Sequence, residues 1–270
     1  MTKGRFTIFP CRIGGVEVVE AASGHVFARH THEQFGIGLI HQGAQKSLSG
    51  RGMVEAGAGD MITVNPGEVH DGVPIGDAGR SWRMLYFEPS AIGDAMEDIS
   101  QGKTRIAEFT EPVFHDVRTS QHFQALFNSI TAPDGDRTGM HGEECVLTLI
   151  ADVMRTRGGQ MHGGGVPSAM RRAQRLIDDD PTVAITLSDL ARAADLSRFQ
   201  VVRGFSRAFG LTPHAYLVQR RIDLARRLIA RGVPLAEAAA EGGFADQSHM
   251  TRIFVRKYGI SPGAYAEAFH

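Results

Sequence analysis

The chain has 270 residues, which is enough for two domains with their own cores, and no apolar run approaches the length needed to span a membrane. Its two cysteines, Cys11 and Cys145, lie far apart, which argues against a disulfide framework and a cysteine-rich zinc site. The net charge of −1 conceals an asymmetry typical of a nucleic-acid-binding module joined to another domain, because residues 166–270 carry 15 Lys+Arg against 10 Asp+Glu, whereas residues 1–165 carry 14 against 20.

The region from Val16 to Pro89 consists of short apolar runs separated by Gly-rich turns. These runs include VEVVEA, FGIGLI, MITVNP and WRMLYFEP. Runs of about 4–8 residues at this spacing predict an all-β sandwich or barrel. A closed barrel of this size leaves room for about one small ligand, which makes the region a candidate effector-binding domain.

The strand SWRMLYFEP has two faces of different character. Side chains alternate between the faces of a strand, so Trp82, Met84 and Tyr86 share one face. We expect this set to line an effector pocket, since such pockets are mostly apolar with a few polar groups. Core packing is the alternative explanation of the same stripe.

Two segments carry the most specific pattern of the N-terminal half. They are HVFARHTHEQFGIGLIHQG, from His25 to Gly43, and GAGDMITVNPGEVHDGVPIGD, from Gly57 to Asp77. With its Gly-Asp followed by Asn-Pro-Gly-Glu-x-His, this region resembles the N-terminal sensor domain of AraC-type transcription regulators, which is related to the cupins. The resemblance covers about residues 10–95 and implies a small β-barrel that binds an effector.

Three histidines, His30, His32 and His70, come from these two segments. Residues i and i+2 of a strand point to the same side, so His30 and His32 can converge, and three imidazoles suit zinc, iron or nickel. Metal-bearing cupins add a carboxylate a few residues beyond the pair, whereas here Glu33 directly follows His32 and would point away. We therefore expect no metal or other cofactor, and interpret the three histidines as contacts to a small effector. Three structural histidines, or a weak metal site, are the alternatives.

Two helix-like segments follow the barrel, His122–Ile130 and Glu143–Arg155, with apolar residues at helical spacing. The resemblance to AraC-type proteins implies that such helices form a homodimer interface, and packing against the barrel is the alternative. Next comes TRGGQMHGGGVP, which is typical of a flexible linker. We therefore predict a barrel domain over residues 1–157, a linker over 158–167 and a second domain over 168–270.

An internal repeat at an offset of 49 residues dominates the second domain. SRFQVVRGFSRAFGLTPHAY, from Ser197 to Tyr216, lies over DQSHMTRIFVRKYGISPGAY, from Asp246 to Tyr265, with seven identical positions. A short Ala-rich helix candidate precedes each copy. Thr186 and Ser197 each open a predicted helix with a capping box. Each copy therefore predicts a helix-turn-helix, and the stretch from Ala215 to Gly232 predicts a long helix that joins them.

The second copy, GFADQSHMTRIFVRKYGISPGAY, is the most specific pattern in the chain. Its Gly-Phe, polar helix start, central Arg, aromatic and basic helix end, and Ser-Pro resemble the signature of AraC/XylS-type bacterial transcription regulators. The resemblance covers about residues 168–268 and implies an all-α domain with two helix-turn-helix motifs. The fold class expected for the whole chain is thus α+β, with a cupin-like barrel, its flanking helices and this helical domain.

Side chains near the start of each second helix are placed to contact base edges, because the N-terminal residues of a recognition helix enter the major groove. The predicted base contacts are Arg198, Phe199, Gln200, Arg203, Gln247, Ser248, His249 and Arg252. Core packing is the alternative for Phe199. The predicted phosphate contacts are Arg207, Arg221, Arg256 and Lys257.

The function favoured by these patterns is a sequence-specific transcription regulator whose barrel senses a small molecule. Its expected partners are double-stranded DNA, an effector, a second copy of the chain and, for an activator, RNA polymerase. The N-terminus lacks the apolar run of a signal peptide, so we expect a cytoplasmic protein with no membrane partner. We expect no enzyme activity. The alternatives are a cupin-type metalloenzyme, such as a dioxygenase or isomerase, with an accessory helical domain, and a regulator that responds to no ligand.

Overall fold

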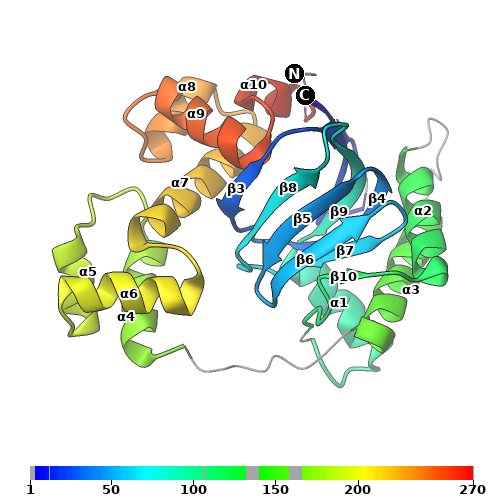
Figure 1. Ribbon diagram of the computed structural model, residues 1–270, viewed down its shortest axis with the longest axis horizontal. Helices are drawn as coiled ribbons and strands as arrows, with labels where there is room; N and C mark the ends of the chain where they lie inside the picture. The colour runs from blue at the N-terminus through cyan, green and yellow to red at the C-terminus, as the bar shows by residue number, and fades with distance from the viewer. Residues whose placement is uncertain (1–3, 12, 106, 132–139, 158–165, 270) are drawn as a thin grey trace. The chain divides into compact units, whose positions relative to one another are not determined.

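The computed structural model describes residues 4–269 except residues 12, 106, 132–139 and 158–165 (Figure 1). Two compact units divide the chain, one with Met1–Val26 and Thr31–His162, the other with Phe27–His30 and Gly163–His270. Strand Phe27–His30 belongs by hydrogen bonding to a sheet of the first unit and is described with that sheet. The predicted linker lies outside the described residues except for Val166 and Pro167, so its flexibility stays a prediction.

A six-stranded antiparallel sheet forms one wall of the N-terminal domain, in the order β1-β2-β9-β4-β7-β10. The strands are β1 (Arg5–Phe9), β2 (Val16–Ser23), β9 (Arg80–Phe87), β4 (Phe35–Gln42), β7 (Met61–Val64) and β10 (Val113–Phe114). A four-stranded sheet in the order β3-β8-β5-β6 forms the other wall. Its strands are β3 (Phe27–His30), β8 (His70–Ile75), β5 (Ala44–Ser49) and β6 (Gly52–Gly57). Contacts of β6 with β4 and β10 bring the two sheets together.

Three helices cover one face of the six-stranded sheet, namely α1 (Pro89–Ile99), α2 (Val117–Thr131) and α3 (Met140–Arg157) (Figure 1). The core between them and the sheet contains the fully buried side chains of Ile37, Leu85, Phe123, Phe127 and Leu149. Helix α2 starts earlier than the spacing of its apolar residues predicts, because the Asp116 carboxylate accepts a hydrogen bond from the Thr119 amide at 2.8 Å and caps the first turn.

The alternation along β9 separates its two faces as the sequence predicts. Leu85 and Phe87 belong to the core beneath the helices. Tyr86 contacts the ring of His32 instead, and Met84 lies against Gly36 and Gly38 of β4. One face of β9 therefore supports the helices while the other faces the interior between the sheets, where a ligand would be held.

The C-terminal domain is entirely helical within the described residues. Its helices are α4 (Ser168–Asp179), α5 (Leu187–Ala194), α6 (Arg198–Phe209), α7 (Pro213–Ala230), α8 (Leu235–Glu241), α9 (Gln247–Tyr258) and α10 (Pro262–Glu267). The pairs α5–α6 and α8–α9 are the two predicted helix-turn-helix motifs, and α7 joins them (Figure 1). Both capping boxes form, at Thr186 with Asp189 and at Ser197 with Gln200. The predicted α+β fold with a double helix-turn-helix is confirmed.

Helix α7 holds the second motif through a buried polar network. Asp223 is 3% exposed, and it accepts hydrogen bonds from Gln219 at 2.9 Å and from the Tyr258 hydroxyl at 2.8 Å. A buried carboxylate is stable only when such donors replace water, and the bond from Tyr258 ties α9 to α7. Among the described residues, no helix is both long and apolar enough to cross a membrane.

Candidate nucleic-acid interface and effector site

The first two turns of α6 present the predicted base-contact residues to solvent. Arg198, Phe199, Gln200 and Arg203 are all exposed. Phe199 is 67% exposed, which is unusual for a large apolar side chain and argues against core packing as its explanation. The Arg203 guanidinium lies 5.6 Å from the centroid of the Phe199 ring, so the two side chains form one exposed group.

Gln200 takes part in helix capping as well as being a candidate base contact. Its side-chain oxygen accepts a hydrogen bond of 2.9 Å from the Ser197 amide, while its own amide donates to the Ser197 hydroxyl at 3.2 Å. The oxygen is thus used in the capping box, and the side-chain amide nitrogen is the group still oriented for an acceptor on a base.

The first two turns of α9 repeat this arrangement with different side chains. Asp246 caps the helix by accepting from the His249 amide at 2.6 Å. Gln247, Ser248 and Arg252 are exposed, whereas His249 is half-buried with its ring 5.5 Å from the Phe244 ring. Gln247, Ser248 and Arg252 therefore remain accessible to a base edge, and His249 is partly committed to packing.

The four predicted phosphate contacts fall into two groups. Arg207 and Arg256 are exposed near the ends of α6 and α9. Arg221 is half-buried and donates to the backbone carbonyls of Pro181 at 2.6 Å and Val183 at 3.1 Å, so it holds the connection between α4 and α5. Lys257 is 5% exposed, and burial lowers the pKa of its amine to about 8. Arg221 and Lys257 therefore have structural surroundings that the basic pattern alone did not indicate.

In the barrel, His30, His32 and His70 converge. Each offers one ring nitrogen, and these three atoms all lie within 4.8 Å of one another. His30 is buried, and the other two are half-buried. Strand β3 ends at His30, so His32 follows the strand instead of sharing it, and the strand periodicity that predicted their convergence does not explain it.

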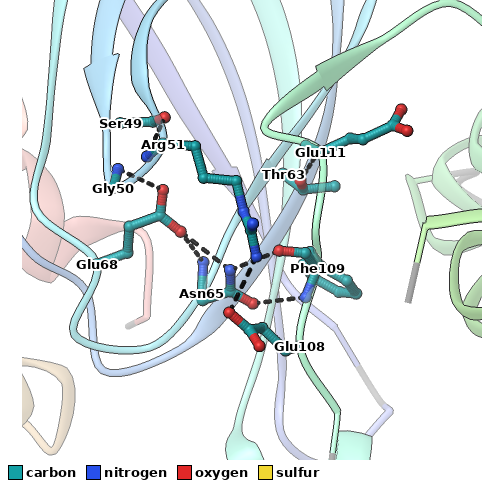
Figure 2. A network of polar contacts seen from close by, with 9 residues as sticks. All are labelled: Ser49, Gly50, Arg51, Thr63, Asn65, Glu68, Glu108, Phe109 and Glu111. Atoms are coloured by element: carbon teal, nitrogen blue, oxygen red, sulfur yellow. Dashed lines mark hydrogen bonds and ion pairs between the residues drawn. The ribbon is translucent and has the colours of Figure 1, made fainter. Parts of the chain in front are cut away.

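A hydrogen-bonded turn from Asn65 to His70 explains the placement instead, and Figure 2 shows the bonds of its residues Asn65 and Glu68. The Gly67 amide donates to the His32 carbonyl at 2.7 Å, with Gly67 in the left-handed region at φ +75. The Glu68 carboxylate accepts from the Gly50 amide at 3.0 Å and from the Asn65 side chain at 3.0 Å. This turn therefore holds the backbone beside His32 and leads directly into His70.

Asn65 anchors the same turn to a distant segment (Figure 2). Its side-chain nitrogen donates to the Phe109 carbonyl at 2.9 Å, and its side-chain oxygen accepts from the Phe109 amide at 2.8 Å. The sequence pattern Asn-Pro-Gly-Glu-x-His indicated the family but assigned a role to His70 alone. Asn65 was missed as a supporting residue because its partner Phe109 lies 44 positions along the chain, and Glu68 because its partner Gly50 lies 18 positions earlier.

The orientation of two imidazoles follows from their Nδ1 atoms. Nδ1 of His30 lies 2.8 Å from the Ala28 carbonyl, and Nδ1 of His70 lies 3.0 Å from the Glu68 carbonyl. A carbonyl oxygen only accepts, so Nδ1 carries a proton in each ring, and in the neutral imidazole the lone pair is on Nε2. Both rings are thereby held in a tautomer suited to bind an electron-pair acceptor.

Aromatic and apolar groups surround the histidines. The ring of His32 lies 5.0 Å from those of both His70 and Tyr86. Met84 fills the space that the missing side chains of Gly36 and Gly38 leave. Trp82 is buried against Phe6 and lies under the Arg80 guanidinium, so it takes part in packing at that point. Of the predicted pocket residues, Tyr86 directly adjoins the histidine cluster through the ring of His32.

Comparison with known proteins decides the family. The model of the AraC-like ligand binding domain matches residues 14–149, about half of the chain, and the model of a helix-turn-helix domain matches residues 190–268. The chain belongs to the AraC family of transcription regulators. The match to the ligand-binding model includes all three clustered histidines, and the match to the helix-turn-helix model includes α6 and α9.

This AraC-family regulator is similar to several known proteins. It is 26% identical over 227 residues to the HTH-type transcriptional regulator YbfI of Bacillus subtilis, covering 83% of this chain and 81% of YbfI. It is 40% identical over 125 residues to the transcriptional activator NphR of Rhodococcus, covering 46% of this chain and 34% of NphR. Among solved structures, the unsaturated-fatty-acid-bound ToxT of Vibrio cholerae covers 98% of the AraC-family chain with a TM-score of 0.61 and 12% identity, and 95% of ToxT is covered. That likeness shows the shared fold.

Proposed function

We propose that this AraC-family regulator reads double-stranded DNA with the first two turns of α6 and α9. The observation that carries the proposal is the repetition of an exposed polar helix start, each capped and each placed second in a helix-turn-helix. Helix α7, with 18 residues, is about 27 Å long at helical rise. That length suits two reading helices in successive major grooves, which lie about 34 Å apart.

Individual roles follow from side-chain chemistry. Arg203 and Arg252 are exposed and occupy equivalent positions of the repeat, where each can donate two hydrogen bonds to a guanine. Phe199 is suited to a thymine methyl group because its ring is already in solvent. Further base contacts are assigned to Arg198, Gln200, Gln247, Ser248 and His249, and phosphate contacts to Arg207 and Arg256.

Selection of bound sequences from random duplex DNA tests this function with the intact chain. The expected product is a bipartite site whose two halves are separated by about one helical turn, protected on one face of the duplex in a footprint. A selected pool with no common sequence would overturn the proposal. The matched control is the variant Arg203→Ala/Arg252→Ala, which should enrich nothing specific while keeping its helical content.

The N-terminal barrel is proposed as the sensor, with its effector at the end lined by His30, His32, His70 and Tyr86. These groups gather polar atoms inside an otherwise apolar interior, which is the usual composition of a ligand site. Effector binding shifts the population of DNA-competent molecules. ToxT was solved with a fatty acid, but at 12% identity the ligand of this chain depends on its own side chains.

We further infer a cytoplasmic homodimer without enzyme activity, which recruits RNA polymerase where it activates transcription. The relatives that match are named as transcriptional regulators, which supports a regulatory role for the barrel. Light scattering of the purified chain across a concentration series tests the dimer, and a monomer at all concentrations would contradict it. Turnover of a substrate in a dioxygenase or isomerase assay of the purified chain would contradict the non-enzymatic role.

A further inference from the structure

We propose that His30, His32 and His70 bind a divalent transition-metal ion in the sensor barrel. This inference names a ligand class for the proposed effector site and so rests on the sensor role proposed above. It replaces our expectation from the sequence, in which the missing carboxylate argued against a metal. The geometry of the imidazoles carries it.

Convergence is the first argument. The three candidate ligand atoms already lie within 4.8 Å of one another. Tetrahedral coordination at metal–nitrogen distances of about 2.0–2.1 Å requires separations of about 3.4 Å between ligand nitrogens. Rotations of the half-buried His32 and His70 rings toward the buried His30 ring would close that difference.

Orientation is the second argument. The Nδ1 atoms of His30 and His70 are each engaged by a backbone carbonyl two residues earlier, at 2.8 Å and 3.0 Å. Metal-binding histidines characteristically donate the other ring N–H to a carbonyl or carboxylate, which fixes the tautomer and raises the basicity of the coordinating nitrogen. Two of the three rings thus have the support that a metal ligand needs.

Support for the third ring comes from the backbone. His32 accepts the Gly67 amide through its carbonyl at 2.7 Å, and the turn that holds Gly67 is braced by Glu68 and Asn65 (Figure 2). The turn joins His32 to His70, whose rings lie 5.0 Å apart. The same hydrogen-bonded turn therefore adjoins both histidines, and such preorganisation lowers the ordering cost of chelation.

The donor set selects the kind of metal. Among the described residues, the cluster contains three imidazoles and no carboxylate. Neutral nitrogen ligands favour Zn²⁺, Ni²⁺, Co²⁺ or Cu²⁺ over Mg²⁺ and Ca²⁺, which prefer oxygen. Three protein ligands leave a coordination position for water or a small anionic molecule. An ion here would also supply positive charge inside a domain whose own net charge is negative.

Titration of the untagged, chelator-treated full chain tests the assignment. By calorimetry, Zn²⁺ and Co²⁺ should each bind with one equivalent per chain, and Mg²⁺ should show no saturable binding. Zn²⁺ should also raise the melting temperature of the barrel, which the fluorescence of the single tryptophan, Trp82, reports. Bound Co²⁺ should give the visible absorption of a site with nitrogen ligands and low coordination number. Absence of saturable Zn²⁺ and Co²⁺ binding to the folded chain would overturn the proposal.

Variants separate this site from adventitious binding. His30→Ala, His32→Ala and His70→Gln should each lose the saturable equivalent, whereas His214→Ala, which removes an exposed histidine of the C-terminal domain, should keep it. Equal binding by all four would overturn the assignment, and the Co²⁺ spectrum of the wild type decides the matter if a variant fails to fold. Failure of the DNA selection would overturn the proposed function without affecting the metal titration. Failure of the metal titration would overturn this assignment without affecting the DNA selection.

Discussion

The backbone amide of Gly67 donates a hydrogen bond of 2.7 Å to the backbone carbonyl of His32. This bond links the segment before β4 to the turn before β8, so two of the clustered imidazoles share a backbone support. Mobility of the turn would misplace both rings at once, because His32 lies between β3 and β4 and His70 is only the first residue of β8. The residues that hold the turn are therefore the most sensitive places to perturb the site without touching it.

Asn65→Ala should destabilise the barrel by about 1–3 kcal/mol, because it removes one donor and one acceptor that pair with the Phe109 backbone. Urea denaturation monitored by the fluorescence of Trp82 measures this, since the only tryptophan of the chain lies in the barrel. Asn128→Ala, at an exposed position of α2, is the matched control and should change stability little. Equal effects of the two substitutions would contradict the anchoring role.

Alanine at Gly38 should be far more disruptive than alanine at Gly36. An added Cβ at Gly38 would lie 2.1 Å from Met84 Sδ and 2.8 Å from the Arg83 carbonyl oxygen, whereas at Gly36 the nearest atom is the flexible Met84 Cε at 2.9 Å. We expect Gly38→Ala to cost about 1–3 kcal/mol of barrel stability and Gly36→Ala less. A second substitution, Met84→Ala, should rescue Gly36→Ala but only partly rescue Gly38→Ala. Complete rescue of both would show that the backbone contact is unimportant.

Arg203→Ala and Arg252→Ala should each weaken specific DNA binding by about 1–3 kcal/mol and relax the base preference at one position. Both guanidinium groups are exposed at the same point of the repeat, so their effects should appear in different halves of the selected site. Arg175→Ala, which removes an exposed arginine of α4, is the control of equal charge. Gel-shift titration with single-base variants of the selected site measures the effect, and equal losses in all three proteins would indicate a general charge effect.

Arg256→Ala should weaken binding nearly equally for specific and unrelated duplexes, because a phosphate contact carries no sequence information. The slope of log affinity against log salt should fall by about 1. Lys257→Ala offers the contrast within the same helix end, since that side chain is buried and should change folding stability more than the salt slope. A fall in slope for Lys257→Ala with stability intact would restore its role as a phosphate contact.

Alkaline pH should unfold the C-terminal domain between about pH 10 and 12. Burial raises the pKa of Tyr216 from 10.0 to about 12, and the pKa of the enclosed Tyr258 also lies well above 10.0, with Asp223 adding to the effect. Above pH 10 the unfolded chain therefore binds fewer protons than the folded one, so stability is complete below pH 10 and decreases as the pH rises through the folded value.

Circular dichroism and tyrosinate absorbance recorded together across this interval measure the alkaline transition. Tyr216→Phe should be less stable at neutral pH, since the hydroxyl bonds to Gln174 and Asp178 at 3.0 Å are lost, yet its stability should fall less steeply above pH 10. Ionisation of all tyrosines near pH 10 with helicity intact would contradict the burial argument.

The helical domain was predictable because its signals are local. Capping residues such as Thr186 and Ser197 act within three positions, and the repeat states the pattern twice. The support of the barrel site was not predictable in the same way, since Asn65 meets Phe109 across 44 positions. His32 illustrates the difference: strand periodicity predicted that it would converge with His30, but β3 has already ended, and a turn from elsewhere in the chain places it. Likewise, basic character alone could not separate exposed Arg256 from buried Lys257.

Helix α7 has a consequence for which operators this chain can recognise. One extra residue in its middle would turn everything beyond it by about 100° and advance it by about 1.5 Å. A duplex compensates poorly, because each added base pair turns the second half-site by only about 34° while moving it about 3.4 Å farther away. Rotation and distance cannot be matched together, so insertions there should abolish recognition and not merely shift the preferred spacing. The length of α7 therefore fixes both the spacing and the rotation of the two half-sites that the chain can bind.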